Sequence, residues 1–120
     1  MICVVFHLYI KYIFNLSLIQ MKLVSMTKAT DGKHKYTAVF DINGKSKTTH
    51  FGAVGYKDFI QYSKQDKSVA EMKKNSYLAR HKVNEDWSDP TKAGTLSKYI
   101  LWSEPSFSAS LAKYKKHFKL

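Results

Sequence analysis

The chain has 120 residues, enough for one domain with a small core. Its formal net charge is +11 at pH 7, and Arg80 is the only arginine among its 20 basic residues. This lysine excess favours nonspecific attraction to polyanions over base reading, because lysine lacks the planar, bidentate contacts of arginine. The alternative is a lysine-rich surface that only keeps the chain soluble. The single cysteine, Cys3, excludes an internal disulfide, and the scattered histidines predict no metal site, so no cofactor is expected.

Residues 1–20 are strongly hydrophobic and carry one charge, Lys11. Their length suits a membrane-spanning helix, but Lys11 and Asn15 near the middle are costly there, and no secretory signal is present. Three interpretations are open: a membrane anchor, an added hydrophobic strand or helix, and an upstream extension that the native protein lacks. We favour the third because Met21 and Met26 offer later starts. A membrane partner is expected only if residues 1–20 are native.

An orderly strand pattern begins after this segment. Strands are expected at residues 22–28, 36–42 and 45–51. Asn43-Gly44 predicts a two-residue hairpin turn, because both residues accept positive φ. This turn places Phe51 opposite Tyr36 and Thr49 opposite Ala38 on one buried face. The sequence therefore predicts a three-stranded antiparallel meander with one solvated face.

Helical patterns follow the predicted meander. Helices are expected at residues 56–62, 69–82, 90–102 and 106–118. Ser68 and Glu71 match a capping box, and Asp89 is expected to cap the next helix with Pro90 at its first position. Residues 21–120 thus predict a single α+β domain in which the meander packs against three or four helices.

The sequence also predicts the buried side of helix 106–118 and a bend before helix 56–62. Apolar residues at helical spacing give helix 106–118 a buried side; these residues are Phe107, Leu111, Tyr114 and Phe118. Gly52 and Gly55 lack the rest of a phosphate-loop fingerprint, so they predict a bend between strand and helix.

A dense polar cluster spans the end of the second predicted helix and the loop before the third. It consists of Arg80, His81, Glu85, Asp86 and Asp89. A histidine near three carboxylates is compatible with a metal-dependent nuclease or a general-base site. However, Asp89 is already expected to cap a helix, and no second cluster completes a site. We therefore interpret the cluster as structural and assign neither catalytic residues nor metal ligands.

Positive charge is concentrated in the first part of the predicted domain. Residues 21–82 hold 13 basic and 5 acidic residues, against 6 and 4 in residues 83–120. A surface that binds nucleic acid or another polyanion is therefore expected on the hairpin and the helix 69–82. Its candidate residues are Lys33, Lys35, Lys45, Lys47, Lys73, Lys74, Arg80 and Lys82.

Three segments, at residues 50–59, 77–102 and 105–120, carry a family resemblance. Their motifs are Phe51-Gly52-Ala53, Arg80-His81, Glu85-Asp86-Trp87, Ala93-Gly94-Thr95-Leu96-Ser97 and Leu101-Trp102. With these motifs the chain resembles an uncharacterised family of small basic proteins in large nucleocytoplasmic DNA viruses that infect algae and other protists. The resemblance covers residues 21–120 and implies a viral setting, but it implies no catalytic residues.

Together, these features lead us to expect a small basic viral protein without enzymatic activity. It would bind nucleic acid or another polyanion, either in the virion or in the cytoplasm or nucleus of the infected cell. The main alternative is a minor capsid protein that contacts other virion proteins or a membrane surface. A metal-dependent nuclease is a third possibility.

Overall fold

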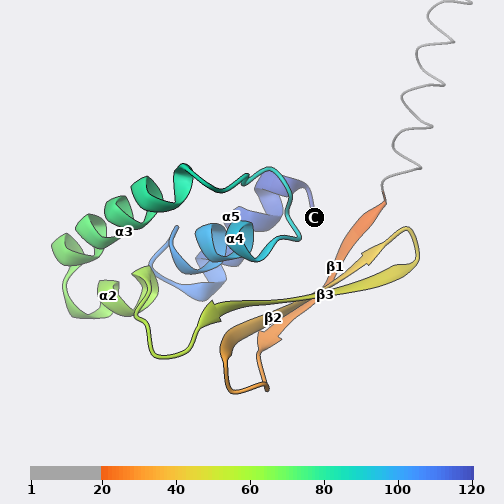
Figure 1. The fold of residues 1–120 in the computed structure, drawn as a ribbon, viewed down its shortest axis with the longest axis horizontal. Coiled ribbons are helices and arrows are strands. Elements are labelled where there is room, and N and C mark those ends of the chain that lie inside the picture. The colour runs from red at the N-terminus through yellow and green to blue at the C-terminus, as the bar shows by residue number, and fades with distance from the viewer. Residues whose placement is uncertain (1–19) are drawn as a thin grey trace, which may run out of the picture.

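The computed structural model describes residues 20–120, so the predicted extension at residues 1–20 lies outside the described part except for Gln20. The described residues form a three-stranded antiparallel sheet and four helices in a single α+β domain, as predicted (Figure 1). The elements are β1 (Met21–Lys28), β2 (His34–Ile42), β3 (Lys45–Ala53), α2 (Phe59–Gln65), α3 (Lys67–Lys82), α4 (Ala93–Leu96), the π-helical segment η1 (Ser97–Leu101) and α5 (Phe107–Phe118).

The sheet has the predicted meander order β1-β2-β3. Its hairpin turns at Asn43, with φ 52°, and Gly44, with φ 84°. Tyr36 pairs with Phe51 and Ala38 with Thr49, so the predicted register is confirmed. Because side chains alternate across a strand, this register directs Phe40 and Phe51 into the core, where both are buried.

Strand β1 departs from a plain strand at Val24. The register of its pairing with β2 shifts between Leu23 and Ser25, which marks a β-bulge, and Val24 is 62% exposed. Without a bulge, Leu23 and Met26 would point to opposite faces, since they are three residues apart. The bulge turns both side chains toward the core.

The core lies between the sheet and the helices α4, η1 and α5 (Figure 1). η1 supplies three consecutive buried residues, which a segment covered on several sides can accommodate. The predicted buried side of α5 is confirmed for Tyr114, which is fully buried and donates a hydrogen bond to the Pro90 carbonyl at 2.6 Å. The other predicted members pack against the core while partly exposed; they are Phe107, Leu111 and Phe118.

Helices α2 and α3 form a pair beside the end of β3 (Figure 1), and both begin at different residues from those predicted. α2 begins three residues later than expected because Asp58 forms a capping box with Gln61. The capping box predicted at Ser68 and Glu71 is wrong. α3 begins at Lys67, and its cap is Asp66. The Asp66 carboxylate accepts hydrogen bonds from the N–H groups of Ser68 and Val69.

The predicted helix 90–102 is also wrong at its start. Asp89 does not cap it, because the Asp89 carboxylate accepts hydrogen bonds from the Thr91 N–H and hydroxyl at 2.9 and 2.8 Å. These bonds close a turn, and the helix begins only at Ala93 without a side-chain cap. The remainder of the predicted helix is the π-helical segment η1, which local sequence patterns do not indicate.

Gly52 supports the bend predicted after the hairpin. Its φ is +79°, and a Cβ at this position would lie 2.8 Å from Cδ1 of Leu101 in η1. Gly55 also has positive φ, at +96°, but nothing lies within 4 Å of a Cβ added there. Gly55 is therefore needed for its backbone conformation alone. Gly52 is needed for its conformation and also for the close approach of β3 to η1.

We predict that Gly52→Ala lowers the free energy of unfolding by about 3 kcal/mol, because backbone strain adds to overpacking against Leu101. Gly55→Ala is the matched control and should lose about 1 kcal/mol, from strain alone. Urea denaturation followed by circular dichroism measures both. Equal losses in the two variants would show that the contact with η1 does not constrain Gly52.

Candidate nucleic-acid interface

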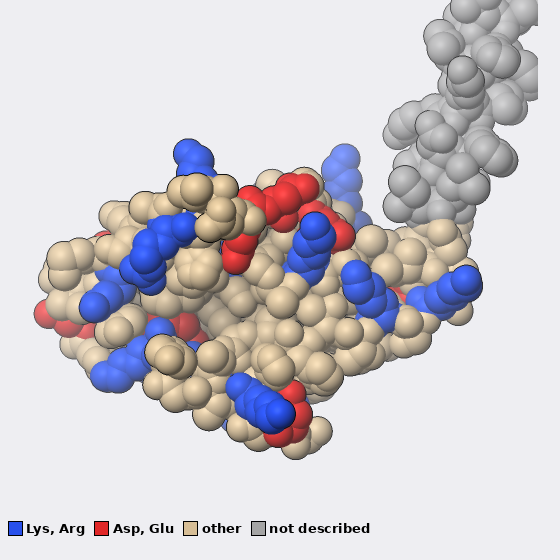
Figure 2. All heavy atoms as spheres, in the orientation of Figure 1, with Lys and Arg blue, Asp and Glu red and all other residues tan. Residues whose placement is uncertain are grey.

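A cavity of about 460 Å³ lies where the end of β3, the helices α2 and α3 and the segment η1 meet; we call it the first cavity. Figure 2 shows the hollow between the helical pair and the sheet, with Lys and Arg side chains around it. Four cationic residues and one carboxylate line it: Lys35, Lys57, Lys73, Arg80 and Asp58. Five ring-bearing residues also line it: Tyr56, Tyr62, Tyr77, His81 and Trp102.

Four of these rings form a continuous row along one wall, which we call the ring row. Tyr77 stacks on Trp102 at 4.4 Å between ring centroids and on His81 at 4.1 Å. Tyr62 extends the row beyond Trp102 at 6.4 Å. Tyr56 differs from these rings, because it is 75% exposed and contacts no other ring among residues 20–120.

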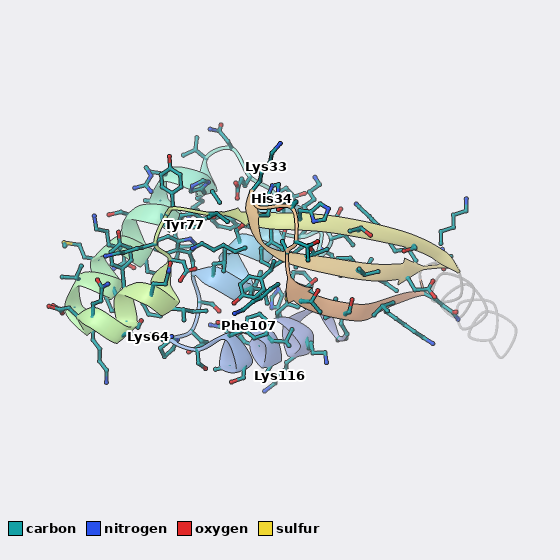
Figure 3. All side chains as sticks on the ribbon, turned by 90° about the horizontal axis from the view of Figure 1, so that it is seen from below. Lys33, His34, Lys64, Tyr77, Phe107 and Lys116 are labelled. Atoms are coloured by element: carbon teal, nitrogen blue, oxygen red, sulfur yellow. The ribbon has the colours of Figure 1, made fainter. Side chains whose placement is uncertain are left out.

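Tyr77 lies at the centre of the ring row, and Figure 3 shows it between α3 and the end of β3. Burial raises the pKa of its phenol to about 12, with the nearby Glu85 carboxylate as a second cause. The phenol is therefore protonated at neutral pH. Ser97, at the start of η1, lines the same cavity and lowers this pKa to a smaller extent.

Three cations of the first cavity lack a carboxylate partner. The Nζ atoms of Lys57 and Lys73 lie 5.9 and 5.8 Å from the centroid of the same Tyr62 ring. Lys57 also donates to the amide oxygen of Gln65 at 3.3 Å. Within the described part of the chain, neither these lysines nor Arg80 forms an ion pair. The cavity therefore presents uncompensated positive charge next to aromatic surface.

Lys35 is the one cation of the first cavity that is neutralised. Its Nζ lies 2.7 Å from the Asp58 carboxylate and donates to Gln61 Oε1 at 3.1 Å. Both side chains are largely buried, with 16% and 7% of their surfaces exposed. Because Asp58 also caps α2, this ion pair attaches the start of the helix to strand β2.

A second cavity of about 630 Å³ adjoins the first. The two share Lys35, Tyr56, Lys57 and Asp58 in their linings, so they lie on either side of the loop before α2. The second cavity adds further basic residues: Lys28, His34 and Lys64. Figure 3 shows His34 and Lys64 in a view from this side. We call the two cavities together the basic trough.

The eight candidate residues from the sequence do not form one surface. Lys35, Lys73 and Arg80 line the first cavity. Lys74, the neighbour of Lys73, points elsewhere and donates to the Ser103 carbonyl at 2.9 Å. Lys47 donates to the Thr91 hydroxyl at 2.9 Å. The remaining candidates are exposed and line neither cavity; they are Lys33, Lys45 and Lys82.

Sequence reasoning missed the cations contributed by the bend and by α2. Lys57 follows the glycine bend and lines both cavities, and Lys64 lies on α2. The clustering of Gly55, Tyr56 and Lys57 could have indicated an exposed loop with a cation and a ring. Tyr56 was instead predicted to begin a helix, and that helix starts later, at Phe59.

The polar cluster at Arg80 to Asp89 separates into two parts. Arg80 and His81 line the first cavity. Glu85 lies behind them, 3.1 Å from His81 Nδ1, and accepts a hydrogen bond from Trp87 Nε1 at 2.7 Å. It also lies over Gly94, where an added Cβ would be 2.8 Å from its carboxylate. Glu85 thus orients the His81 ring and fixes the following loop.

The two aspartates of this cluster close local turns. The Ser88 hydroxyl and N–H donate to Asp86 and lower the pKa of its carboxyl. The Thr91 N–H, and to a smaller extent its hydroxyl, lower the pKa of Asp89. Among residues 20–120 no group of three or more His, Cys, Asp or Glu side chains is arranged to hold a metal ion. Asp86 and Asp89 instead bind Ser88 and Thr91 and so stabilise the two turns.

No protein-family model matches the chain, and neither the curated proteins nor the solved structures give a significant match. In residues 20–120 no helix has the length and apolar character needed to cross a membrane. The resemblance to the viral family stays a prediction.

We predict that Asp58→Ala lowers the free energy of unfolding by about 3 kcal/mol, because it uncaps α2 and leaves Lys35 unpaired in the cavity wall. Asp58→Asn is the control that keeps an oxygen to cap the helix, so it should lose about half as much. Thermal and urea unfolding measure both. The prediction fails if the two variants are equally stable.

Proposed function

We propose that this chain is a nonenzymatic nucleic-acid-binding protein that holds a single-stranded segment in the basic trough. The observation that carries the proposal is the joint presence, in one cavity, of unpaired cations and the exposed ring of Tyr56. Proteins that bind single strands combine these two elements, because cations attract phosphates while aromatic faces stack on bases.

The shape of the trough favours a single strand over a duplex. A cavity of about 460 Å³ is the size of a small-molecule site and receives a nucleotide, but not a double helix. Tyr56 lies between the two cavities with most of its ring exposed, where an unpaired base can stack on it. A paired base in a duplex has its faces covered by its neighbours.

Sequence-specific reading of a duplex has less support. The commonest base-specific contact is a bidentate arginine on guanine, and Arg80 is the only arginine of the chain. Lysines supply the remaining positive charge, and they suit contact with phosphates of any sequence. The proposed binding is therefore tolerant of sequence and sensitive to salt.

The other functions considered from the sequence gain no comparable support. For a metal-dependent nuclease, the carboxylates of the polar cluster would have to converge, but Asp86 and Asp89 each bind their own neighbouring residue. A place in a virus particle, as a packaged or minor capsid protein, stays a prediction that rests on the family resemblance.

We predict that Arg80→Ala and Lys73→Ala each weaken the binding of a single-stranded oligonucleotide by about tenfold, because each removes a charged contact to phosphate. Each should also reduce the slope of log affinity against log salt by about 0.7. Fluorescence anisotropy at several salt concentrations measures both quantities. A duplex of equal length should bind more weakly than the single strand.

The matched control is Lys116→Ala, on α5 and outside the lining of both cavities (Figure 3). It removes the same charge as Lys73→Ala and should change affinity less than twofold. An equal effect of the two substitutions would mean that net charge, not the trough, drives binding. Absence of any binding at about 50 mM salt would refute nucleic-acid binding altogether.

A further inference from the structure

The first cavity gathers more positive charge than one backbone phosphate needs. Lys57 and Lys73 place two ammonium groups within 6 Å of the Tyr62 ring centroid, at 5.9 and 5.8 Å, with no carboxylate in an ion pair with either. Arg80 lies on the same side of α3 as Lys73, two helical turns further on. Like charges that line one cavity repel one another, and an anion bound among them removes this repulsion.

We infer that the first cavity is a receptor for the terminal phosphate monoester of a nucleic-acid strand. The inference rests on the proposed function and names the part of the strand that this cavity takes. A phosphodiester in mid-strand carries one negative charge, whereas a phosphate monoester carries about 1.5 to 2 at pH 7. The monoester therefore matches three unpaired cations better than a diester does.

The hydrogen-bonding capacity of the cations leads to the same ligand. Arg80 presents a planar fork that binds two oxygens of one phosphate at once. A diester offers two charged oxygens for the three cations to share. A monoester offers three, so each cation can have an oxygen of its own.

The walls of the cavity suit the end of a strand. On the side shared with the second cavity, the lining is formed by Lys35 and the loop that carries Tyr56 and Lys57. The remaining walls are formed by α2, α3 and η1, and the ring row lies along them. A strand that enters over Tyr56 from the second cavity faces α3 and η1, and we place its end there.

Within this arrangement the parts of the terminal nucleotide have separate places. The phosphate lies among Lys57, Lys73 and Arg80, and the base stacks on the exposed ring of Tyr56. The next nucleotides extend into the second cavity, where Lys28 and Lys64 neutralise their phosphodiesters. The two cavities thus have different tasks, one for the end and one for the strand that follows.

Isothermal titration calorimetry with the full chain tests the inference, using one ten-nucleotide single-stranded DNA in three forms. The forms carry a 5′-phosphate, a 3′-phosphate, or hydroxyls at both ends. We expect at least one phosphorylated form to bind about tenfold more tightly than the hydroxyl form. A preference for one end identifies the polarity of the bound strand, and an equal gain at both ends shows that the cavity reads the phosphate alone.

Substitutions locate this preference. Arg80→Ala should abolish it, and Arg80→Lys should reduce it while keeping the charge, because lysine lacks the fork. Lys64→Ala, in the second cavity, is the control: it should weaken all three oligonucleotides equally and keep the ratio. A preference that survives Arg80→Ala and Lys73→Ala would overturn the inference.

The possible failures are distinguishable. If the three forms bind with equal affinity, the terminal-phosphate receptor is refuted while single-strand binding in the trough stands. If none of the three forms binds at about 50 mM salt, the proposed function fails together with the inference.

Discussion

The ion pair between Lys35 and Asp58 is the contact on which the basic trough depends. Asp58 uses its carboxylate twice: it caps α2 by accepting from the Gln61 N–H at 3.0 Å, and it binds the Lys35 ammonium on β2. α2 packs against α3, so this carboxylate helps to hold both helices against the sheet, together with the Lys74 bond to the Ser103 carbonyl and the stacking of Tyr77 on Trp102. With the helical pair so held, the space between it and the end of β3 becomes a cavity.

The same contact explains why the other cations of the first cavity remain unpaired. Asp58, the only carboxylate that residues 20–120 place in the lining, is committed to Lys35 and to the helix cap, so Lys57 and Lys73 share the Tyr62 ring instead. The helical pair also has few fully buried apolar residues, with Phe59 on α2 and Ala70 on α3. Weak packing and repulsion between like charges both lower the stability of this helical pair. Such unfavourable arrangements are expected where a protein binds a ligand.

Local signals in the sequence were sufficient for the sheet and for α5, but not for the site. The Asn43-Gly44 turn determines the register of its hairpin because only two residues separate the strands. The residues at which the helices begin were harder to predict, because several aspartates and serines are equally good local candidates for a cap. Asp58 and Asp66 cap helices whereas Asp89 closes a turn with Thr91, and this choice is made by tertiary packing.

The site itself was beyond local prediction because adjacent residues on α3 have opposite tasks. Lys73 faces the cavity, while Lys74 donates to the Ser103 carbonyl and lies over the Phe59 ring at 4.8 Å. Composition counts both as positive charge. Whether Lys73 or Lys74 faces the cavity depends on how α3 is rotated against α2 and η1. That rotation cannot be predicted from a local sequence pattern.

The motifs that carry the family resemblance acquire physical roles at this cavity. Gly52 allows the sheet to approach η1, Gly94 leaves room for the Glu85 carboxylate, and Glu85 in turn orients His81. Trp102 completes the ring row. Segments far apart in the sequence therefore meet around the first cavity, and close approach, ring stacking and charge explain their residue types. Under the proposed function, the lysines elsewhere on the surface would raise the attraction to polyanions in general, while the cavity would select the polyanion that is held.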